Sequence, residues 1–367
     1  MKPGNGLKYL QIRDLLVDRF KKAGYTSGRK LPTEHALTVE LGVSRSTIRQ
    51  ALDLLESDGI IVRKHGSGTF FVGHAEPDHA GQTGLIGLIN FFFMDYIYPE
   101  IIRAIEETIS AEGYSLALAN CNLDTQREIE SVERLVEQGV KGLILEPSRN
   151  SQIDETHPMQ RLISELKIPI VTTHWGISNL RVSTVTVDDV RAGYEATRYL
   201  INAGHREIAL VYKREVQAGE DRFAGYRRAL SEADIQYREE RVVSFNNAEE
   251  AQNYRQGYEL TTQLLERTPR PTAIFYFNDH IAMQGYQAIQ EWGLAIPDDV
   301  SVIGFDNYAP TALLHPPLTT FEHPKYELGR WAAKLLLDEI SQPRANRLPM
   351  KLVFEPTLVE RASVRRR

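Results

Sequence analysis

The sequence has a single cysteine, Cys121, and no run of about twenty apolar residues. One cysteine excludes an internal disulfide and any cysteine-rich metal site, and we expect neither a metal nor a cofactor. The absence of a long apolar run excludes a transmembrane helix. The opening residues, MKPGNGLKYLQIRDLL, become charged and helical at once and do not form a signal peptide. We therefore expect a soluble cytoplasmic protein.

The motifs of common enzyme classes are also missing. The chain has no Gly-x-Ser-x-Gly elbow, no phosphate-binding loop and no His-Glu-x-x-His pair. Gly66 and Gly68 belong to a predicted β-hairpin, so they do not form a dinucleotide-binding loop. We therefore predict that the protein is not an enzyme.

The stretch from Lys30 to Phe71 carries the strongest pattern in the chain. Its apolar residues recur at helical spacing, with one break at Gly42 and a restart at Ser44, a predicted N-cap. These apolar residues are Leu37, Leu41, Val43, Ile48, Leu52 and Leu55. The pattern predicts a helix-turn-helix.

The second of these helices has a basic polar face near its N-terminus. This face carries Arg45, Ser46, Thr47, Arg49 and Gln50, and no carboxylate occurs between Glu40 and Asp53. Arginine can bind guanine with two hydrogen bonds in the major groove, and glutamine or serine can contact other base edges. The pattern favours a DNA-reading helix over a small helical domain with a basic face and no nucleic acid.

Two short strand-like runs, Ile60 to Arg63 and Thr69 to Val72, follow the second helix. The residues between them, Lys64 to Gly68, are small or cationic. This pattern predicts a β-hairpin whose tip contacts phosphates or enters the minor groove.

The phrases LPTEHAL, VSRSTIRQALDLLESDGII and GSGTFF resemble the winged-helix DNA-binding domain of the GntR family. The resemblance implies that Arg45 and Arg49 read bases, that Ser46 and Thr47 hold phosphate, and that residues 65–68 form the tip of the wing. It also implies double-stranded operator DNA as the partner. The full set of DNA contacts that we predict is Lys8, Arg29, Lys30, Glu34, Ser44, Arg45, Ser46, Thr47, Arg49, Gln50, Lys64, His65, Gly66 and Ser67.

Length and charge divide the chain into a small head and a larger body. The 367 residues exceed what one hydrophobic core usually organises. Residues 1–73 hold 12 lysines and arginines against seven aspartates and glutamates, whereas the whole chain has a formal net charge of −6. A cationic head on an anionic body suits a protein that binds DNA through the head alone. We predict a DNA-binding domain at 1–73, a flexible linker at 74–83 and a second domain at 84–367, with a first helix at 8–22.

The body alternates β-rich runs with helical stretches, which predicts parallel sheets covered by helices. We predict strands at 85–92, 115–119, 142–146, 170–173, 184–187, 207–211, 273–277 and 301–305. We predict helices at 101–112, 125–138, 158–166, 190–203, 222–233, 248–265, 280–292 and 326–341. Eight strands favour two doubly wound α/β lobes. The first would span about 84–185 and 323–350, and the second about 186–322 and 351–361.

Phrases such as VTVDDVRAGYEATRYLINAGHREIALV, DRFAGYRRAL, DDVSVIGFDN and PPLTTFEHPKYELGRWAAKLLLDEI resemble the sensor domain of LacI/GalR repressors, a relative of periplasmic sugar-binding proteins. A GntR-type head on this body looks like the arabinose-utilisation repressors of Gram-positive bacteria. The resemblance implies a cytoplasmic, nucleoid-associated homodimer that represses sugar-utilisation genes until a pentose, L-arabinose, binds. The alternatives are a sensor of another sugar or of a purine, an activator, or a component of sugar transport.

Two-lobed α/β proteins bind ligands between the lobes, at the carboxyl ends of strands. We therefore predict sugar contacts among the polar and aromatic residues that follow strands, and the resemblance supports Arg222, Asn278, Asp306 and His323 in particular. The full set is Tyr96, Glu146, Arg149, His174, Trp175, Arg222, Asn278, Asp279, Asp306 and His323.

Several of these residues have a simpler structural interpretation. Asp279, like Asp189, is favoured as a helix cap. Trp175 can serve as packing between the lobes instead of a sugar platform. Tyr96, Glu146 and Arg149 can be solvent-exposed pairs. Arg222 can form a salt bridge with Asp221 or Glu220.

Overall fold

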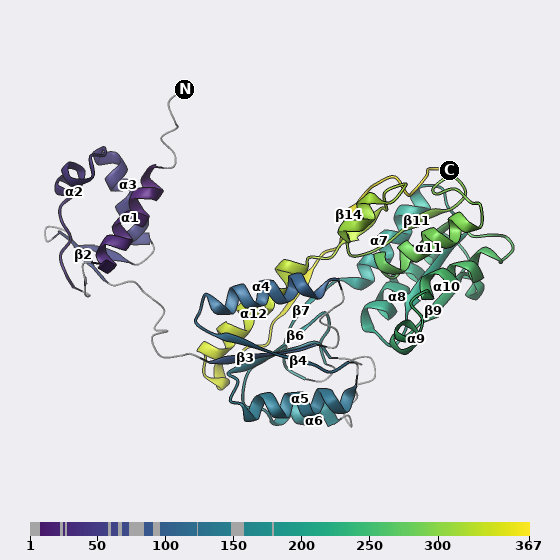
Figure 1. Cartoon of the computed structure of the whole chain (residues 1–367), viewed down its shortest axis with the longest axis horizontal. Helices are drawn as coiled ribbons and strands as arrows, with labels where there is room; N and C mark the ends of the chain where they lie inside the picture. Colours follow the sequence, from purple (N-terminus) through teal and green to yellow (C-terminus); the bar gives the residue numbers. More distant parts are fainter. Residues whose placement is uncertain are drawn as a thin grey trace. The chain divides into compact units, whose positions relative to one another are not determined.

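The computed structural model divides the chain into two compact units, Met1–Gln82 and Thr83–Arg367 (Figure 1). It describes residues 8–22, 25, 28–57, 60–64, 68–72, 84–90, 96–122, 124–147, 158–177 and 180–367. Within these residues, no helix is long and apolar enough to cross a membrane.

The N-terminal unit is a winged helix-turn-helix, as predicted. Its described residues form three helices, α1 (Lys8–Lys22), α2 (Glu34–Leu41) and α3 (Arg45–Ser57), followed by an antiparallel hairpin of β1 (Ile61–Lys64) and β2 (Gly68–Phe71). The Thr33 hydroxyl caps α2, and Gly42 ends it with a φ of 61°, which is the left-handed conformation that glycine favours. The Ser44 hydroxyl accepts a hydrogen bond from the Thr47 amide and so caps α3, as predicted.

The core of this unit comes from one face of each helix and from the hairpin. Ile12, Leu16 and Phe20 of α1 lie four residues apart and are buried with Ile48 and Leu52 of α3. Leu15 is 47% exposed, because it does not lie on the helix face formed by these three residues. The segment before α2 is tied to the hairpin by a single antiparallel β-bridge between Lys30 and Phe70.

The first lobe of the C-terminal unit contains a six-stranded sheet. Its strands run in the order β13, β7, β6, β5, β3, β4, and all neighbours are parallel. The strands are β3 (Leu85–Asn90), β4 (Ser115–Asn120), β5 (Gly142–Leu145), β6 (Ile170–Thr173), β7 (Ser183–Val187) and β13 (Lys351–Phe354). Helices α4 (Tyr98–Ser110) and α12 (Lys325–Ser341) cover one face of the sheet, and α5 (Thr125–Glu137) and α6 (Pro158–Glu165) cover the other (Figure 1).

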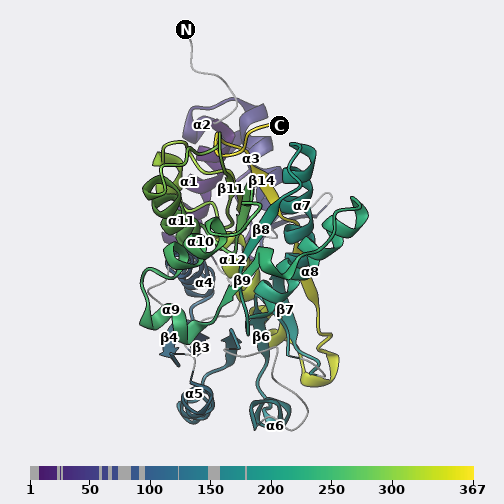
Figure 2. The same cartoon turned by 90° about the vertical axis from the view of Figure 1, so that its right-hand side faces the viewer.

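The second lobe contains a four-stranded parallel sheet in the order β11, β10, β8, β9. The strands are β8 (Ile208–Lys213), β9 (Val242–Phe245), β10 (Ala273–Tyr276) and β11 (Ser301–Ile303). Its helices are α7 (Asp189–Asn202), α8 (Gln217–Glu232), α9 (Asn247–Gln252), α10 (Gln256–Leu265) and α11 (Asp279–Glu291). Helices α7 and α8 pack with one face of the sheet, and α10 and α11 pack with the other. Figure 2 shows the structure turned by 90°, with the second lobe facing the viewer.

The chain passes between the lobes three times. It crosses from β7 to α7, from β12 (Thr320–Glu322) to α12, and from β13 to β14 (Thr357–Val359). Strands β12 and β14 pair with each other, and Glu322 forms a bridge to Asp306 at the end of the second sheet. The two lobes are therefore joined by three segments. The alternating pattern predicted two α/β lobes, and the structure confirms them.

Some predicted elements differ from the structure. Strands β9, β12, β13 and β14 were not predicted, and the single helix expected at 248–265 is two helices with a break between Gln252 and Gln256. We expected 351–361 in the second lobe, but residues 351–354 form β13, which pairs with β7 in the sheet of the first lobe. These short strands are defined by distant partners and not by a local pattern.

Candidate functional site

The polar face of α3 is exposed in the N-terminal unit. The side chains of Arg45 and Arg49 are 69% and 57% exposed. Ile48, between them in sequence, is fully buried, so packing against the core fixes the orientation of this face. The Ser44 hydroxyl lies 2.9 Å from that of Ser46 and 2.7 Å from that of Thr47. The residues predicted to contact DNA on this helix, including Gln50, are therefore exposed or half-buried at its N-terminal end.

Glu34, at the start of α2, pairs with both arginines of this face. Its Oε2 lies 3.4 Å from the Arg45 Nε and 3.2 Å from the Arg49 Nη2. The hydrogen bond from Arg49 is the main cause that lowers the pKa of Glu34. Glu34 was predicted as a DNA contact, and its position orients both cations and reduces their net charge.

Arg29 and Lys30, which were also predicted to contact DNA, lie next to β2 of the hairpin. The Arg29 guanidinium lies 4.1 Å from the centre of the Tyr25 ring, and Lys30 Nζ lies 5.9 Å from that of Phe70. The side chains of Lys8 and Lys64, and the whole of residues 65–67 (His65, Gly66 and Ser67), lie outside the described part of the structure.

A cavity of about 70 Å³ lies where the two lobes meet. Eight of the ten predicted sugar contacts line it, from both lobes and from the crossover before α12. They are Tyr96, Glu146, His174, Trp175, Arg222, Asn278, Asp306 and His323. Arg149 lies outside the described residues. Asp279 does not line the cavity.

Arg222 is a buried cation of the cavity lining, and its side chain is only 5% exposed. Its Nε lies 2.8 Å from Oδ1 of Asp189, and its Nη1 donates to the Phe277 carbonyl over 2.5 Å. The guanidinium also lies 3.6 Å from the centre of the Phe305 ring. The salt-bridge partner of Arg222 is therefore Asp189, and neither Asp221 nor Glu220 as we had considered.

The two aspartates that we interpreted as helix caps have other roles. Asp188 caps α7, accepting from the Arg191 amide, and Asn278 caps α11, accepting from the Ile281 amide. Asp279 is buried and accepts from the Tyr308 amide over 2.8 Å and from the Thr320 hydroxyl over 2.7 Å. Burial raises its pKa to about 7. In both cases the cap is the residue before the predicted one, so the following aspartate points inward.

Glu146, His174 and His323 form a continuous polar chain along the wall of the cavity. The Glu146 Oε1 lies 3.0 Å from the His174 Nδ1, and the Nε2 atoms of the two histidines lie 3.1 Å apart. Tyr98 donates a hydrogen bond to the Glu146 Oε1 over 3.0 Å. All four side chains are buried or nearly so. The simpler interpretation, that Glu146 belongs to a solvent-exposed pair, is therefore wrong.

Tyr96 connects the first lobe to the second. Its hydroxyl donates to Asp306 Oδ2, and its ring lies 4.4 Å from that of Tyr308. Asp306 and the next residue, Asn307, have φ angles of 107° and 48°, a left-handed conformation that is strained for residues with a Cβ. The Nζ of Lys325 donates to the carbonyl of Asp306, which helps to hold this turn.

Trp175 packs in the core of the first lobe and also lines the cavity, so its role as a sugar platform stays a prediction. Its indole N–H donates to the Pro147 carbonyl over 3.0 Å, and the side chain is buried in the core of the first lobe. One part of the ring lines the cavity. The hydrogen bond fixes the ring, so it forms a rigid wall.

Lys213 is a cavity residue that we did not predict. It is the last residue of β8, is 8% exposed, and its Nζ lies 2.6 Å from the Glu250 Oε2 in α9. We predicted that this strand ends at Val211, so the residues after the true end were not considered. Tyr98 was missed for a different reason, because it lies in the first turn of α4.

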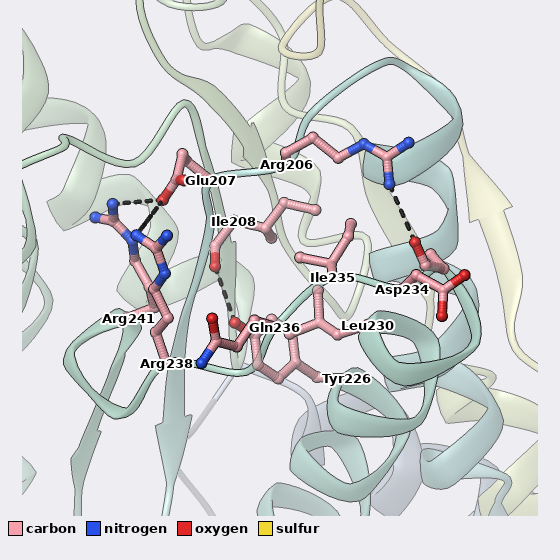
Figure 3. Close-up of a pocket in the computed structure, with 11 residues that line it drawn as sticks. Arg206, Glu207, Ile208, Tyr226, Leu230, Asp234, Ile235, Gln236, Arg238 and Arg241 are labelled. Atoms are coloured by element: carbon pink, nitrogen blue, oxygen red, sulfur yellow. Dashed lines mark hydrogen bonds and ion pairs between the residues drawn. The ribbon is translucent and has the colours of Figure 1, made fainter.

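A larger cavity, of about 560 Å³, lies at the opposite end of the second sheet, near the beginning of β8 (Figure 3). Its polar groups contact each other. Glu207 lies 2.6 Å from Arg241 and 3.5 Å from Arg238, and Arg206 donates to the Ala233 carbonyl. These contacts stabilise the lobe, and the cavity between the lobes remains the candidate site.

The chain matches two known families. Residues 8–71 match the profile described as bacterial regulatory proteins of the gntR family, and residues 197–364 match that of the periplasmic binding protein-like domain. These matches agree with the head and the body of the structure.

Known relatives extend the likeness to the whole chain. An arabinose metabolism transcriptional repressor of Geobacillus stearothermophilus is 33% identical over 98% of both chains. The HTH-type transcriptional repressor PurR of Pectobacterium carotovorum is 36% identical over 77% of this chain and 80% of its own. A LacI family transcriptional regulator from Enterococcus faecium, solved with bound ribose, has a TM-score of 0.66 at 26% identity and covers 77% of this chain and 99% of its own.

The buried pair of Asp189 and Arg222 leads to a stability prediction. Replacing Asp189 by alanine leaves the Arg222 charge buried without its carboxylate, so we expect the free energy of unfolding of the C-terminal unit to fall by about 3–5 kcal/mol. Asp188→Ala is the matched control, because it removes only a helix cap and should cost about 1 kcal/mol. Urea unfolding followed by tryptophan fluorescence measures both. Equal losses for the two variants would contradict the assignment of the pair.

Proposed function

Because the chain belongs to the family of the arabinose metabolism transcriptional repressors, we propose that it represses sugar-utilisation genes and that L-arabinose, bound between the lobes, releases it from its operator. The observation that carries this proposal is the 33% identity over 98% of both chains, which covers the head and the body together. A match to the body alone would support only the binding of a small molecule.

The chemistry of the cavity supports an uncharged, hydroxyl-rich ligand. Most of the charged groups that line it have counterions within the protein, since Arg222 pairs with Asp189, Lys213 with Glu250 and His174 with Glu146. The Asp306 carboxylate accepts a hydrogen bond from the Tyr96 hydroxyl. A ligand with a net charge would disturb this balance, whereas sugar hydroxyls can both donate and accept hydrogen bonds. The aromatic walls supply apolar surface for the C–H faces of a sugar ring.

The exposed face of α3 supports major-groove binding by the head. Arg45 and Arg49 are paired with Glu34 at the surface, where an ion pair contributes only about 0–1 kcal/mol. Phosphates or guanine can therefore replace Glu34 at little cost. We propose that Glu34 orients the two arginines and that the arginines make the base contacts.

We also propose that the protein acts as a homodimer. One winged helix presents a small surface to DNA, and two heads related by twofold symmetry would read the two half-sites of a pseudo-palindrome. Sedimentation equilibrium of the full chain checks this proposal, and a monomer at the concentrations that give specific binding would contradict it.

Replacing Arg45 by alanine tests the reading helix. We expect specific operator binding to weaken by about 1–3 kcal/mol, because a base contact is lost. Arg19→Ala is the matched control, since Arg19 also pairs with a glutamate of α2, Glu40, but lies on α1. Gel-shift titrations at fixed salt, with operator and with random duplex, measure both variants. If Arg19→Ala weakened specific binding as much as Arg45→Ala, α3 would not be the reading helix.

The release model is tested by titrating L-arabinose into the operator complex. We expect a loss of operator affinity of roughly 5-fold to 150-fold, the usual range for coupling between two sites. Arg222→Lys should retain operator binding and lose the response to sugar, because lysine keeps a charge opposite Asp189 but not the planar set of donors. The matched control is Arg228→Lys, a surface residue of the same helix that pairs with Glu232.

Two results would contradict parts of this proposal. Unchanged operator affinity at saturating L-arabinose, together with release by another sugar or by a purine in the same assay, would reject arabinose as the ligand. A normal response to sugar in Arg222→Lys would remove the guanidinium of Arg222 from the site.

A further inference from the structure

Three polar atoms of residues that line the cavity are buried and have no hydrogen-bond partner among the described residues. One of them, Nδ1 of His174, lies 3.0 Å from Oε1 of Glu146 in an ion pair. The other two are Oε2 of Glu146 and Nδ1 of His323. Both residues line the cavity, at the two ends of the chain formed by Glu146, His174 and His323. Burying such atoms costs free energy unless another group pairs with them. A bound ligand is the group that would pair with them here.

The positions of the protons in this chain follow from its geometry. A hydrogen bond between two histidine nitrogens needs one donor and one acceptor. The His174 Nδ1 lies 3.0 Å from Oε1 of Glu146. The two atoms are not aligned for a hydrogen bond, but they are close enough for an ion pair. This nitrogen therefore carries a proton. If His174 is also protonated at Nε2, it donates to the Nε2 of His323. The proton of a neutral His323 must then be on Nδ1.

We propose that Glu146, acting through His174, fixes His323 as a hydrogen-bond donor at Nδ1, so that this end of the cavity accepts only a ligand oxygen with a free lone pair. Glu146 presents Oε2 as an acceptor at the other end and takes a hydroxyl group. The inference rests on the proposed function and adds the positioning role of Glu146 and His174. An amino sugar with an ammonium group beside His323 would be rejected, because two donors would face each other.

The electrostatics of the two histidines agree with this assignment. Burial lowers the pKa of His174, but the Glu146 carboxylate, with more distant help from Asp189 and Asp306, raises it above the usual 6.5. Burial lowers the pKa of His323 well below 6.5, and the charges of His174, Lys325 and Arg222 lower it further. His174 is therefore the charged member of the pair and His323 the neutral one.

This arrangement makes sugar affinity depend on pH in a defined direction. When His174 loses its Nε2 proton, His323 must donate through its own Nε2, and its Nδ1 becomes an acceptor. Binding is therefore strongest while His174 is protonated and weakens as the pH rises through its raised pKa. Linkage of one proton gives a fall in affinity of up to about tenfold per pH unit above the midpoint. L-Arabinose itself does not titrate in this range.

Calorimetric titration of the full chain with L-arabinose between pH 6 and pH 9 tests the inference. For the unmodified protein we expect the affinity to fall at high pH, with a midpoint above 6.5. Glu146→Gln removes the carboxylate, lowers the pKa of His174 and should move the midpoint to lower pH. His174→Gln keeps an amide donor toward His323 but cannot titrate, so this decline in affinity should disappear.

Two further variants serve as controls. Asp279 titrates near pH 7 outside the cavity, and Asp279→Asn should keep the alkaline decline with its midpoint unchanged. His35→Gln, on the exposed side of α2, should leave the whole profile unchanged. Circular dichroism at each pH establishes that the variants are folded, and the profile of the unmodified protein tests the inference even if one variant is not.

The outcomes separate this inference from the proposed function. No binding of L-arabinose by the unmodified protein at any pH would reject the proposed ligand. Two results would contradict the role of Glu146 and His174 while still supporting L-arabinose as the ligand. One is equal affinity from pH 6 to pH 9, and the other is a midpoint that does not change in Glu146→Gln.

Discussion

The close packing of α7 against α8 is the constraint on which the cavity depends. A Cβ added to Gly193 would lie 2.0 Å from the Arg222 carbonyl oxygen, and one added to Gly225 would lie 2.1 Å from that of Val190. The two helices approach this closely because neither glycine has a side chain. This approach brings Asp189 and Arg222 together across the helix interface. The guanidinium then lies over Phe305 and faces the cavity.

Arginine and carboxylate pairs have different consequences in the two units. In the head, Glu34 holds Arg45 and Arg49 at the surface, where solvent screens the attraction and phosphate can compete for the cations. In the body, Asp189 holds Arg222 in the interior, where breaking the pair would leave a charge without solvent. The same chemical pair is therefore exchangeable in one unit and a fixed part of the framework in the other.

The sequence predicted those features that depend on local pattern. The helix-turn-helix, its Ser44 cap, the hairpin and most strands of the body follow from apolar periodicity and turn residues, and the structure confirms them. The sequence pattern did not predict β13, because this strand is defined by its pairing with β7, which is distant in sequence. Asp189 and Asp279 were misread by one position, since either of two adjacent polar residues can cap a helix. Lys213 was missed because strand ends are hard to locate from composition.

The size of the cavity constrains how a ligand can act on this protein. About 70 Å³ is well below the roughly 300–1,000 Å³ of typical ligand sites, so the lobes must separate or rearrange before a monosaccharide enters. Tyr96, which pairs with Asp306 across the lobes, opposes this separation. A ligand can shift the balance between lobe positions only through its difference in affinity for them. Such a difference can arise at residues that bridge the lobes, such as Tyr96, because their contacts change when the lobes move.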